Sequence, residues 1–303
     1  MDANEDESLI RQAVGTIPAF NGFQGHIERL GGLTNRVYRA GAACLRIPGK
    51  GTEEYIDRAN EAVAAREAAR AGVSPEVLHF DAKTGVMATR FLAGAVTMSP
   101  EGFKTRKGAP ARAGQVFRRL HDSGAQFPFR FELFAMIDDY LAILSTKDVT
   151  LPDGYHDVVR EAAFVRSALS ARPLPLAPCH CDPLCENFLD TGERMWIVDW
   201  EYSGMNDPMW DLGDLSVEGQ FDADQDEAMI RAYFGGPPSP AERGRIVIYK
   251  AMCDLLWTLW GLIQLANDNP ADDFRAYADG RFARCKALMS TEDFERQVAA
   301  VRG

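Results

Sequence analysis

Residues 179–188 read CHCDPLCENF, and residues 195–202 follow closely with MWIVDWEY. The first stretch contains the pattern His-x-Asp-x4-Asn, and the second is an apolar strand that ends in an aspartate. Phosphoryl transfer to a hydroxyl needs a carboxylate beside that hydroxyl, and an amide oxygen with a second carboxylate to hold magnesium. Asp182 is therefore the candidate for orienting the hydroxyl, and Asn187 and Asp199 are the candidate metal ligands.

Two other interpretations of these residues are open. A polar surface loop would explain His-x-Asp alone, but the Asn at this offset and the Asp after the strand favour a phosphotransfer site. A zinc site is suggested by Cys179, Cys181 and Cys185 around His180. The spacing argues against zinc, because structural zinc ligands come in separate pairs and no second pair follows. Reduced thiols are expected instead.

The two stretches resemble the catalytic and metal-binding loops of the kinase-like phosphotransferases that act on small molecules, such as aminoglycoside, choline and ethanolamine kinases. They are most similar to the choline/ethanolamine kinase branch. Cys181 and Glu186 stand where aminoglycoside enzymes tend to have glycine, Pro183 follows the first Asp, and Glu201 follows the metal-binding Asp. The resemblance covers about residues 31–288 and implies an α+β, bilobal protein-kinase-like fold.

Composition places the chain among soluble globular proteins. Its 303 residues are 46% hydrophobic and 25% charged, which allows a large core. The net charge of -11 argues against a nucleic-acid partner or an anionic membrane surface. The N-terminus is acidic and has no signal-peptide pattern, so a cytoplasmic location is expected. The apolar run 246–266 is interrupted by Lys250 and Asp254, which indicates a buried helix and not a membrane insertion.

The order of expected elements matches two lobes. Residues 1–92 are expected to form a small N-terminal lobe with an antiparallel sheet and one helix, and the hinge is expected at about 91–95. Residues 96–303 are expected to form a larger, mainly helical catalytic and acceptor-binding lobe. Strands are predicted at 27–30, 36–39, 43–47, 77–80 and 86–91. A short leading helix followed by a turn is predicted within 10–23, and further helices at 55–71, 111–123, 132–144, 156–171, 224–234, 242–266 and 272–289.

The hairpin between the first two strands is a candidate for binding phosphate. A glycine-rich turn can bring backbone N–H groups close to a nucleotide, although a plain turn is the commoner meaning of this pattern alone. The family resemblance favours nucleotide binding. It implies ATP as the phosphoryl donor, with Mg²⁺ as the metal. The hairpin consists of Gly31, Gly32, Leu33, Thr34 and Asn35.

Further groups of the site are implied by the resemblance. Arg46 takes the place of the strand lysine that contacts phosphates in kinases, and arginine can fork across phosphate oxygens. Its carboxylate partner is Glu61 or Glu67, and Glu61 has the spacing found in choline kinases. Asp211 is the candidate for accepting hydrogen bonds from the catalytic loop, with Asp214 as the alternative.

Two more roles near the catalytic loop can be assigned from the resemblance. His180 is expected to hold the loop through a backbone hydrogen bond, so it supports the structure and is not a general base. Glu201 either helps to hold a second magnesium ion or is a surface residue beside the metal site.

The acceptor is suggested by aromatic residues near the C-terminus. Trp257 and Trp260 lie three residues apart on a predicted helix, and Tyr277 lies on the next one. Aromatic faces attract a quaternary ammonium. From the pattern alone, packing in the core is the more common role of such residues. Choline kinases carry a matching Trp-x-x-Trp helix, so the resemblance implies a small cationic alcohol, above all choline. Asp254 is the candidate counter-charge.

Three functions follow from these observations. A choline kinase is preferred, and a kinase for ethanolamine, thiamine or an aminoglycoside is the alternative. A nucleotide-binding pseudokinase ranks third, because every base and metal position is occupied by a suitable residue. A protein kinase is disfavoured, because Asp199-Trp-Glu replaces Asp-Phe-Gly. The sequence leaves both a monomer and a homodimer open.

Overall fold

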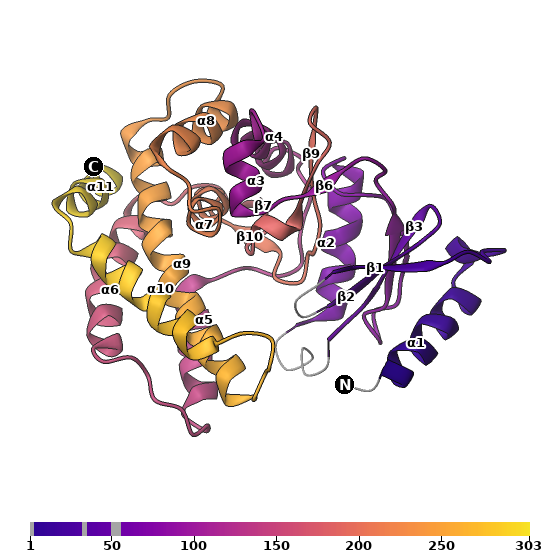
Figure 1. The fold of residues 1–303 in the computed structure, drawn as a ribbon. Coiled ribbons are helices and arrows are strands. Elements are labelled where there is room, and N and C mark those ends of the chain that lie inside the picture. Colours follow the sequence, from indigo (N-terminus) through magenta and orange to yellow (C-terminus); the bar gives the residue numbers. More distant parts are fainter. Residues whose placement is uncertain (1–2, 32–34, 50–55) are drawn as a thin grey trace.

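The structure is a computed structural model, and it describes residues 3–31, 35–49 and 56–303. The chain forms a smaller lobe built on an antiparallel sheet and a larger, mostly helical lobe (Figure 1). This confirms the fold class expected from the sequence.

The N-terminal lobe is a five-stranded sheet in the order β1-β2-β3-β5-β4, with every neighbouring pair antiparallel. Helix α1 (Ala3–Thr16) and the short turn η1 (Pro18–Phe20) pack against one face of this sheet. Helix α2 packs against strands β4 and β5 through its alanines. The strands are β1 (Ile27–Gly31), β2 (Arg36–Ala40), β3 (Ala43–Ile47), β4 (Val77–Phe80) and β5 (Met87–Arg90).

Helix α2 spans Arg58–Arg70, and its start is fixed by a capping residue. The Asp57 carboxylate accepts hydrogen bonds from the backbone N–H groups of Ala59 and Asn60, at 2.8 and 3.1 Å. These bonds satisfy two donors that have no partner within the helix. The cap fixes the residue at which the helix begins, and this start determines which side chains of the first turn face the rest of the protein.

The C-terminal lobe carries two small sheets between its helices. One has the order β6-β8-β9, from Val96–Thr97, Phe188–Asp190 and Met195–Ile197, and the other pairs β7 (Ala177–Cys179) with β10 (Gly204–Asn206). The turn η3 (Cys185–Asn187) precedes β8. The helices are α3 (Pro100–Thr105), α4 (Ala109–His121), α5 (Leu133–Leu144), α6 (Tyr155–Ala171), α7 (Met209–Glu218), α8 (Ala223–Phe234), α9 (Pro240–Ala266), α10 (Phe274–Met289) and α11 (Glu292–Arg302).

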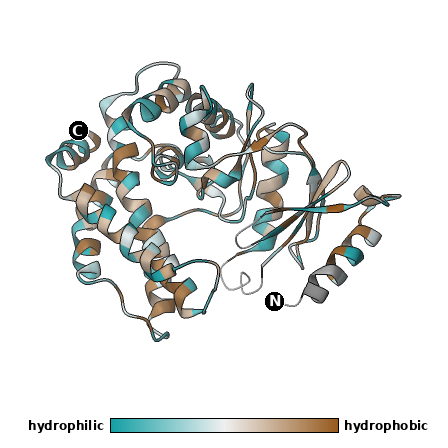
Figure 2. Ribbon diagram, in the orientation of Figure 1, coloured by the Kyte–Doolittle hydropathy of each residue, from teal (hydrophilic) through white to brown (hydrophobic). Residues whose placement is uncertain are grey.

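Helix α9 is the centre of the large lobe. It is long and apolar enough to cross a membrane, but 83% of its most apolar window is buried inside the protein. Apolar residues dominate this helix, as Figure 2 shows. Helices α5, α7, α10 and α11 pack around it. The sequence-based prediction of a buried helix here is confirmed.

Some boundaries differ from the sequence-based expectation. The leading helix lies earlier than 10–23, and α2 begins at Arg58 because Asp57 caps it. Helices α3, α7 and α11 were not predicted. Strand β5 ends at Arg90 and β6 begins at Val96, and we propose that the hinge lies between them.

Candidate active site

The catalytic loop leaves strand β7 and is held by Asp211. The backbone N–H groups of His180 and Cys181 each donate to the Asp211 carboxylate at 2.8 Å. Nε2 of His121 also contacts it, at 3.0 Å. Asp214, the alternative residue for this role, lies instead against Trp257. Asp211 is thus the residue that fixes the start of the loop.

His180 is fully buried beneath the loop, and its Nε2 lies 2.9 Å from the carbonyl oxygen of Val198. Because a carbonyl only accepts, Nε2 must carry the proton. Burial lowers the pKa of His180, which favours the neutral ring. The histidine therefore links the catalytic loop to the strand before Asp199, in agreement with a structural role.

Backbone strain occurs at two residues of the site, at Cys181 directly before Asp182 and at Asp199 itself. Cys181 and Asp199 have φ angles of +68°, in the left-handed region that residues other than glycine rarely adopt. Such conformations cost about 1–3 kcal/mol and are concentrated at functional sites. Cys181 turns the chain immediately before Asp182, and its buried thiol packs under the loop.

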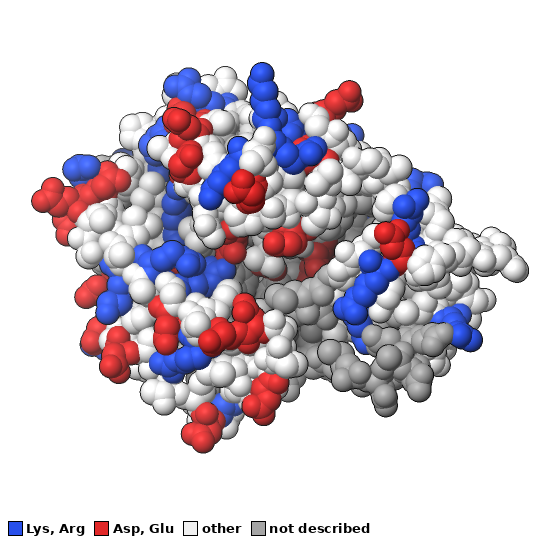
Figure 3. All heavy atoms as spheres, viewed as in Figure 1, with Lys and Arg blue, Asp and Glu red and all other residues white. Residues whose placement is uncertain are grey.

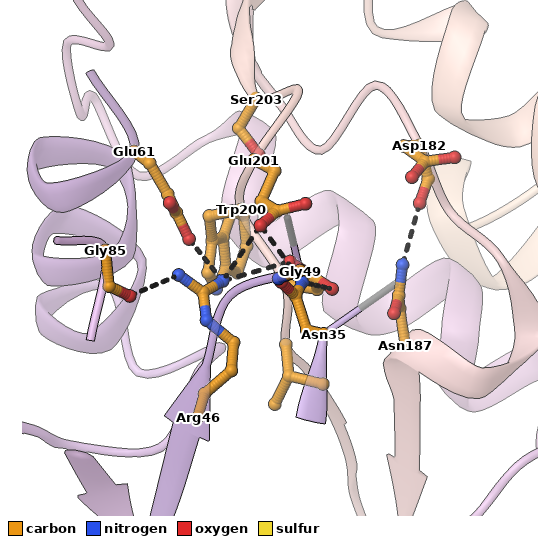
Figure 4. A network of polar contacts seen from close by, with 12 residues as sticks. Asn35, Arg46, Gly49, Glu61, Gly85, Asp182, Asn187, Trp200, Glu201 and Ser203 are labelled. Carbon is orange, nitrogen blue, oxygen red and sulfur yellow. Dashed lines mark hydrogen bonds and ion pairs between the residues drawn. The ribbon is translucent and has the colours of Figure 1, made fainter. Parts of the chain in front are cut away.

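Asn187 and Asp182 lie together on the same side of the loop (Figure 4). The side-chain NH₂ of Asn187 donates to the backbone oxygen of Asp182 at 3.0 Å. This bond fixes the amide so that its oxygen is directed away from Asp182 and can accept a cation. Burial, followed by the charges of Glu218 and Asp199, raises the pKa of Asp182 well above its usual value.

Carboxylates from both lobes meet beside Asp199. Oxygens of Glu61, Asp199 and Glu201 lie within 4.8 Å of one another. Burial and then the charge of Glu201 raise the pKa of Asp199 to about 7. A divalent cation would favour the ionised form, and carboxylate and amide oxygens are the ligands that magnesium prefers. The donor set of Asn187, Asp199 and Glu201 therefore fits Mg²⁺.

Arg46 on β3 joins this carboxylate group from the opposite side. Its Nη1 forms an ion pair with Glu61 and lies 3.3 Å from Asp199 Oδ1 and 3.6 Å from Glu201 Oε1. Its Nη2 donates to the carbonyl oxygen of Gly85 at 3.2 Å. The Arg46 side chain is only 6% exposed, so it is a buried residue and not a surface arginine at the end of the strand. The carboxylate partner of Arg46 is Glu61. Glu67 pairs with Arg70 instead.

The hairpin after β1 is described only at its two ends. Gly32, Leu33 and Thr34 lie outside the described residues. Gly31 ends β1 with a φ of +150°, and Asn35 is buried at 3% exposure. The Asn35 side chain donates to Asp199 Oδ2 at 3.2 Å and to Glu201 Oε1 at 2.9 Å. Asn35 thus contacts the candidate metal ligands, a role that its position in a glycine-rich hairpin did not indicate.

Of the three aromatic residues expected at the acceptor site, Trp260 and Tyr277 come together between α9 and α10. The rings of Trp260 and Tyr277 are 5.7 Å apart, and Phe274 lies 5.7 Å from Trp260. Trp257 packs instead against Tyr202, at 5.4 Å, and its Nε1 donates to Asp214 at 3.3 Å. Tyr202 directly follows Glu201 in the sequence, so Trp257 lies close to the candidate metal ligands.

Asp254 does not have the free charge expected of it. It is 2% exposed and binds Arg281 Nη1 at 3.1 Å. It also binds Arg284 at 2.7 and 3.0 Å. These arginines neutralise Asp254, which argues against its predicted role as a counter-charge for the acceptor. The carboxylate stabilises the packing of α9 on α10.

The acidic groups near the aromatic residues come from α7. Burial and the charge of Glu218 raise the pKa values of Asp182 and Asp214 well above the usual range, so these three carboxylates influence one another directly. Arg281 pairs with Glu218 and lies 4.6 Å from the centre of the Tyr277 ring. Sequence reasoning missed Glu218, although its spacing of four after Asp214 would place both on one helix face. Figure 3 shows acidic side chains gathered in the hollow between the lobes.

The buried trio His121, Cys179 and Asp211 could also hold a metal by distance alone. Each member already has a protein partner. His121 Nδ1 lies 2.9 Å from the Tyr233 hydroxyl, and the Cys179 thiol donates to the carbonyl oxygen of Asn206. Burial raises the pKa of Cys179, which keeps the thiol protonated and a poor metal ligand. Hydrogen bonding accounts for this cluster.

Comparison with known proteins agrees with the geometry of the site. Residues 26–243 match the model of the APH phosphotransferase enzyme family, and the chain belongs to this family. Within it, the chain is a member of the choline/ethanolamine kinase family. A crystal structure of a choline/ethanolamine kinase family protein from Mesorhizobium loti is 76% identical, covers 98% of this chain and 99% of that one, and has a TM-score of 0.91.

More distant relatives carry more specific names. The structure of choline kinase LicA from Streptococcus pneumoniae is 26% identical, with coverage of 95% of this chain and 100% of the other and a TM-score of 0.78. Protein LicA of Haemophilus influenzae is 27% identical over 82% of this chain and 75% of its own length. The chain is therefore a small-molecule kinase that binds a nucleotide and phosphorylates an alcohol.

Proposed function

We propose that this protein transfers the γ-phosphoryl group of ATP to the hydroxyl of choline. The observation that supports a cationic acceptor most directly is the acidic group of Asp182, Asp214 and Glu218 beside the aromatic rings of Trp260 and Tyr277. Burial and then the charge of Glu218 raise the pKa values of Asp182 and Asp214, although Arg281 acts against this rise, so the site has room for more positive charge. A ligand with a positive charge and one hydroxyl would compensate it further.

The aromatic residues favour a quaternary ammonium over a primary one. Such a cation has no N–H donors and is attracted to aromatic faces by about 0.5–2 kcal/mol per ring. Trp260 and Tyr277 offer two neighbouring rings, and Tyr202 and Trp257 offer two more. Ethanolamine is the second candidate, because its ammonium group could donate to Asp214 and Glu218.

The residues around the reacting groups have separate roles in this proposal. Asp182 accepts a hydrogen bond from the acceptor hydroxyl and takes its proton late in the transfer. Arg46 contacts phosphate oxygens and is held for this purpose by Glu61. Asn187, Asp199 and Glu201 are the side chains that would hold Mg²⁺, which supplies positive charge to the phosphates. Positioning and charge stabilisation account for most of the expected rate.

The proposal is tested by ADP release with ATP and Mg²⁺, with choline, ethanolamine, thiamine and kanamycin supplied separately. We expect turnover with choline, reduced about 10²–10⁴-fold in Asp182→Asn while nucleotide binding is kept. Trp260→Ala should raise the KM for choline about tenfold. The matched control is Phe164→Ala, an exposed aromatic on α6, which should leave the KM unchanged. Turnover with another acceptor alone would refute the choline assignment, and ATP binding without turnover would indicate a pseudokinase.

A further inference from the structure

Arg58 is a buried cation in the cleft to which the proposed reaction assigns no role. It is the first residue of α2, in the N-terminal lobe, and its side chain is 11% exposed. Its Nη1 donates to Glu61 Oε2 at 2.7 Å and to Glu201 Oε1 at 2.5 Å. Glu201 follows β9 in the C-terminal lobe, so Arg58 connects the two lobes through one carboxylate.

The oxygen that Arg58 contacts is already crowded. Glu201 Oε1 also accepts from the Asn35 side chain at 2.9 Å, and Arg46 Nη1 lies 3.6 Å away. A magnesium ion binds its oxygen ligands at about 2.0–2.1 Å in near-octahedral geometry. The same oxygen cannot accept several close N–H donors and a magnesium ion together, because the donors occupy the directions from which the ion must approach.

Charge balance supports the same conclusion. Glu61, Asp199 and Glu201 bring three carboxylates into one volume within 4.8 Å, and Arg46 alone would leave this group with excess negative charge. Arg58 brings a second positive charge to it. A cation that enters the group therefore meets repulsion from Arg58 as well as competition for the Glu201 oxygen.

We propose that Arg58 is a positioning residue that competes with the divalent cation for Glu201 and so sets the metal concentration that the enzyme needs. Arg58 holds Glu201 and so links the two lobes. A metal ion held by Glu201 would displace Arg58 from that carboxylate, and Arg58 would keep its pair with Glu61. This inference rests on the proposed magnesium-dependent phosphotransfer.

The test measures metal binding directly, with Mn²⁺ as the probe and electron paramagnetic resonance as the readout, in protein saturated with ADP. Arg58→Gln keeps a polar side chain and removes the charge. We expect Mn²⁺ to bind about tenfold more tightly, as expected for the loss of one positive charge about 6 Å from a divalent ion in a water-like dielectric. The gain in Mn²⁺ affinity should disappear in the double variant that carries both Arg58→Gln and Glu201→Gln.

The matched control is Arg70→Gln, at the other end of α2, where the arginine pairs with Glu67 on the surface. It should leave Mn²⁺ binding unchanged. If Arg58→Gln does not fold, Arg58→Lys serves instead, because a single ammonium group cannot hold both carboxylates as the guanidinium does. We expect Mn²⁺ to bind that variant more tightly than the unchanged protein and less tightly than Arg58→Gln, because lysine keeps the positive charge.

The outcomes separate the two proposals. Unchanged or weaker Mn²⁺ binding in a folded Arg58 variant would overturn the role of Arg58 and leave choline phosphorylation intact. Tighter Mn²⁺ binding in an enzyme that does not turn over choline would support the role of Arg58 and refute the acceptor. Failure of the unchanged protein to bind Mn²⁺ with ADP would overturn both.

Discussion

Asp211 and Asp254 show how neighbouring residues decide what a buried carboxylate does. Both are almost completely buried, and both lie within seven residues of a tryptophan in the sequence. Asp211 accepts two backbone N–H groups of the catalytic loop, so it controls the position of Asp182. Asp254 binds two arginine side chains, so it stabilises the contact between two helices.

Asp254→Ala is expected to destabilise the protein by about 1–3 kcal/mol, because it removes one of the two carboxylate partners of the buried Arg281 and leaves the other, Glu218. The free energy of unfolding in urea measures this loss. Asp279→Ala is the matched control on α10, since its pair with Arg275 is exposed and contributes about 0–1 kcal/mol. A stable Asp254→Ala protein with much weaker acceptor binding would restore the counter-charge role that the structure argues against.

At the scale of elements, the acceptor site depends on the close approach of α9 and α10. Gly261 lies on α9 where a Cβ atom would be 2.6 Å from the Tyr277 ring, closer than atoms can pack. The glycine thus lets Tyr277 lie beside Trp260. Without it, α10 would have to move or Tyr277 would have to rotate away.

Gly261→Ala should displace Tyr277, raise the KM for the acceptor, and cost about 1–3 kcal/mol of stability through overpacking. Steady-state kinetics and thermal unfolding measure the two effects. Gly280→Ala on α10 is the control, because no atom lies within 4 Å of its Cβ position. That substitution should be neutral or stabilising by up to about 1 kcal/mol. If both variants have the same KM for the acceptor and the same stability, the close approach of α9 and α10 is not required for acceptor binding.

At the scale of the whole molecule, the two lobes are joined by polar contacts that surround the candidate metal ligands. Trp200, between Asp199 and Glu201, donates from its Nε1 to the Ser74 hydroxyl at 3.0 Å. Nearby, the N–H of Ile197 donates to the carbonyl oxygen of Val73 at 2.9 Å. Ligands that bind in the cleft should therefore stabilise both lobes together.

ATP with Mg²⁺ at 100 times its Kd should raise the free energy of unfolding by about 2.7 kcal/mol. Chelation of the metal with EDTA should remove most of this increase, because the carboxylate group then binds no cation. Asp199→Asn should also lose the metal-dependent part, whereas Asp279→Asn, on the surface of α10, should keep it. Calorimetric unfolding measures each case. Equal stabilisation with and without the metal would contradict the assignment of Asp199.

The local motifs were sufficient to predict the fold class and much of the catalytic loop. His-x-Asp-x4-Asn and the strand that ends in Asp199 are short patterns, and residues close by in the sequence determine their geometry. The sequence alone therefore indicated the position of the catalytic loop along the chain and the chemistry that suits it. The burial of helix α9 was also predictable, because the apolar run 246–266 is interrupted by Lys250 and Asp254.

Contacts between distant residues were decided only by the tertiary structure. Asp254 lost its expected role because Arg281 and Arg284, about 30 residues away, turn toward it from α10. Arg58 and Asn35 meet Glu201 across more than 140 positions of sequence. The charge on a buried group depends on which partners folding brings within a few ångströms, and residue order along the chain does not state those distances.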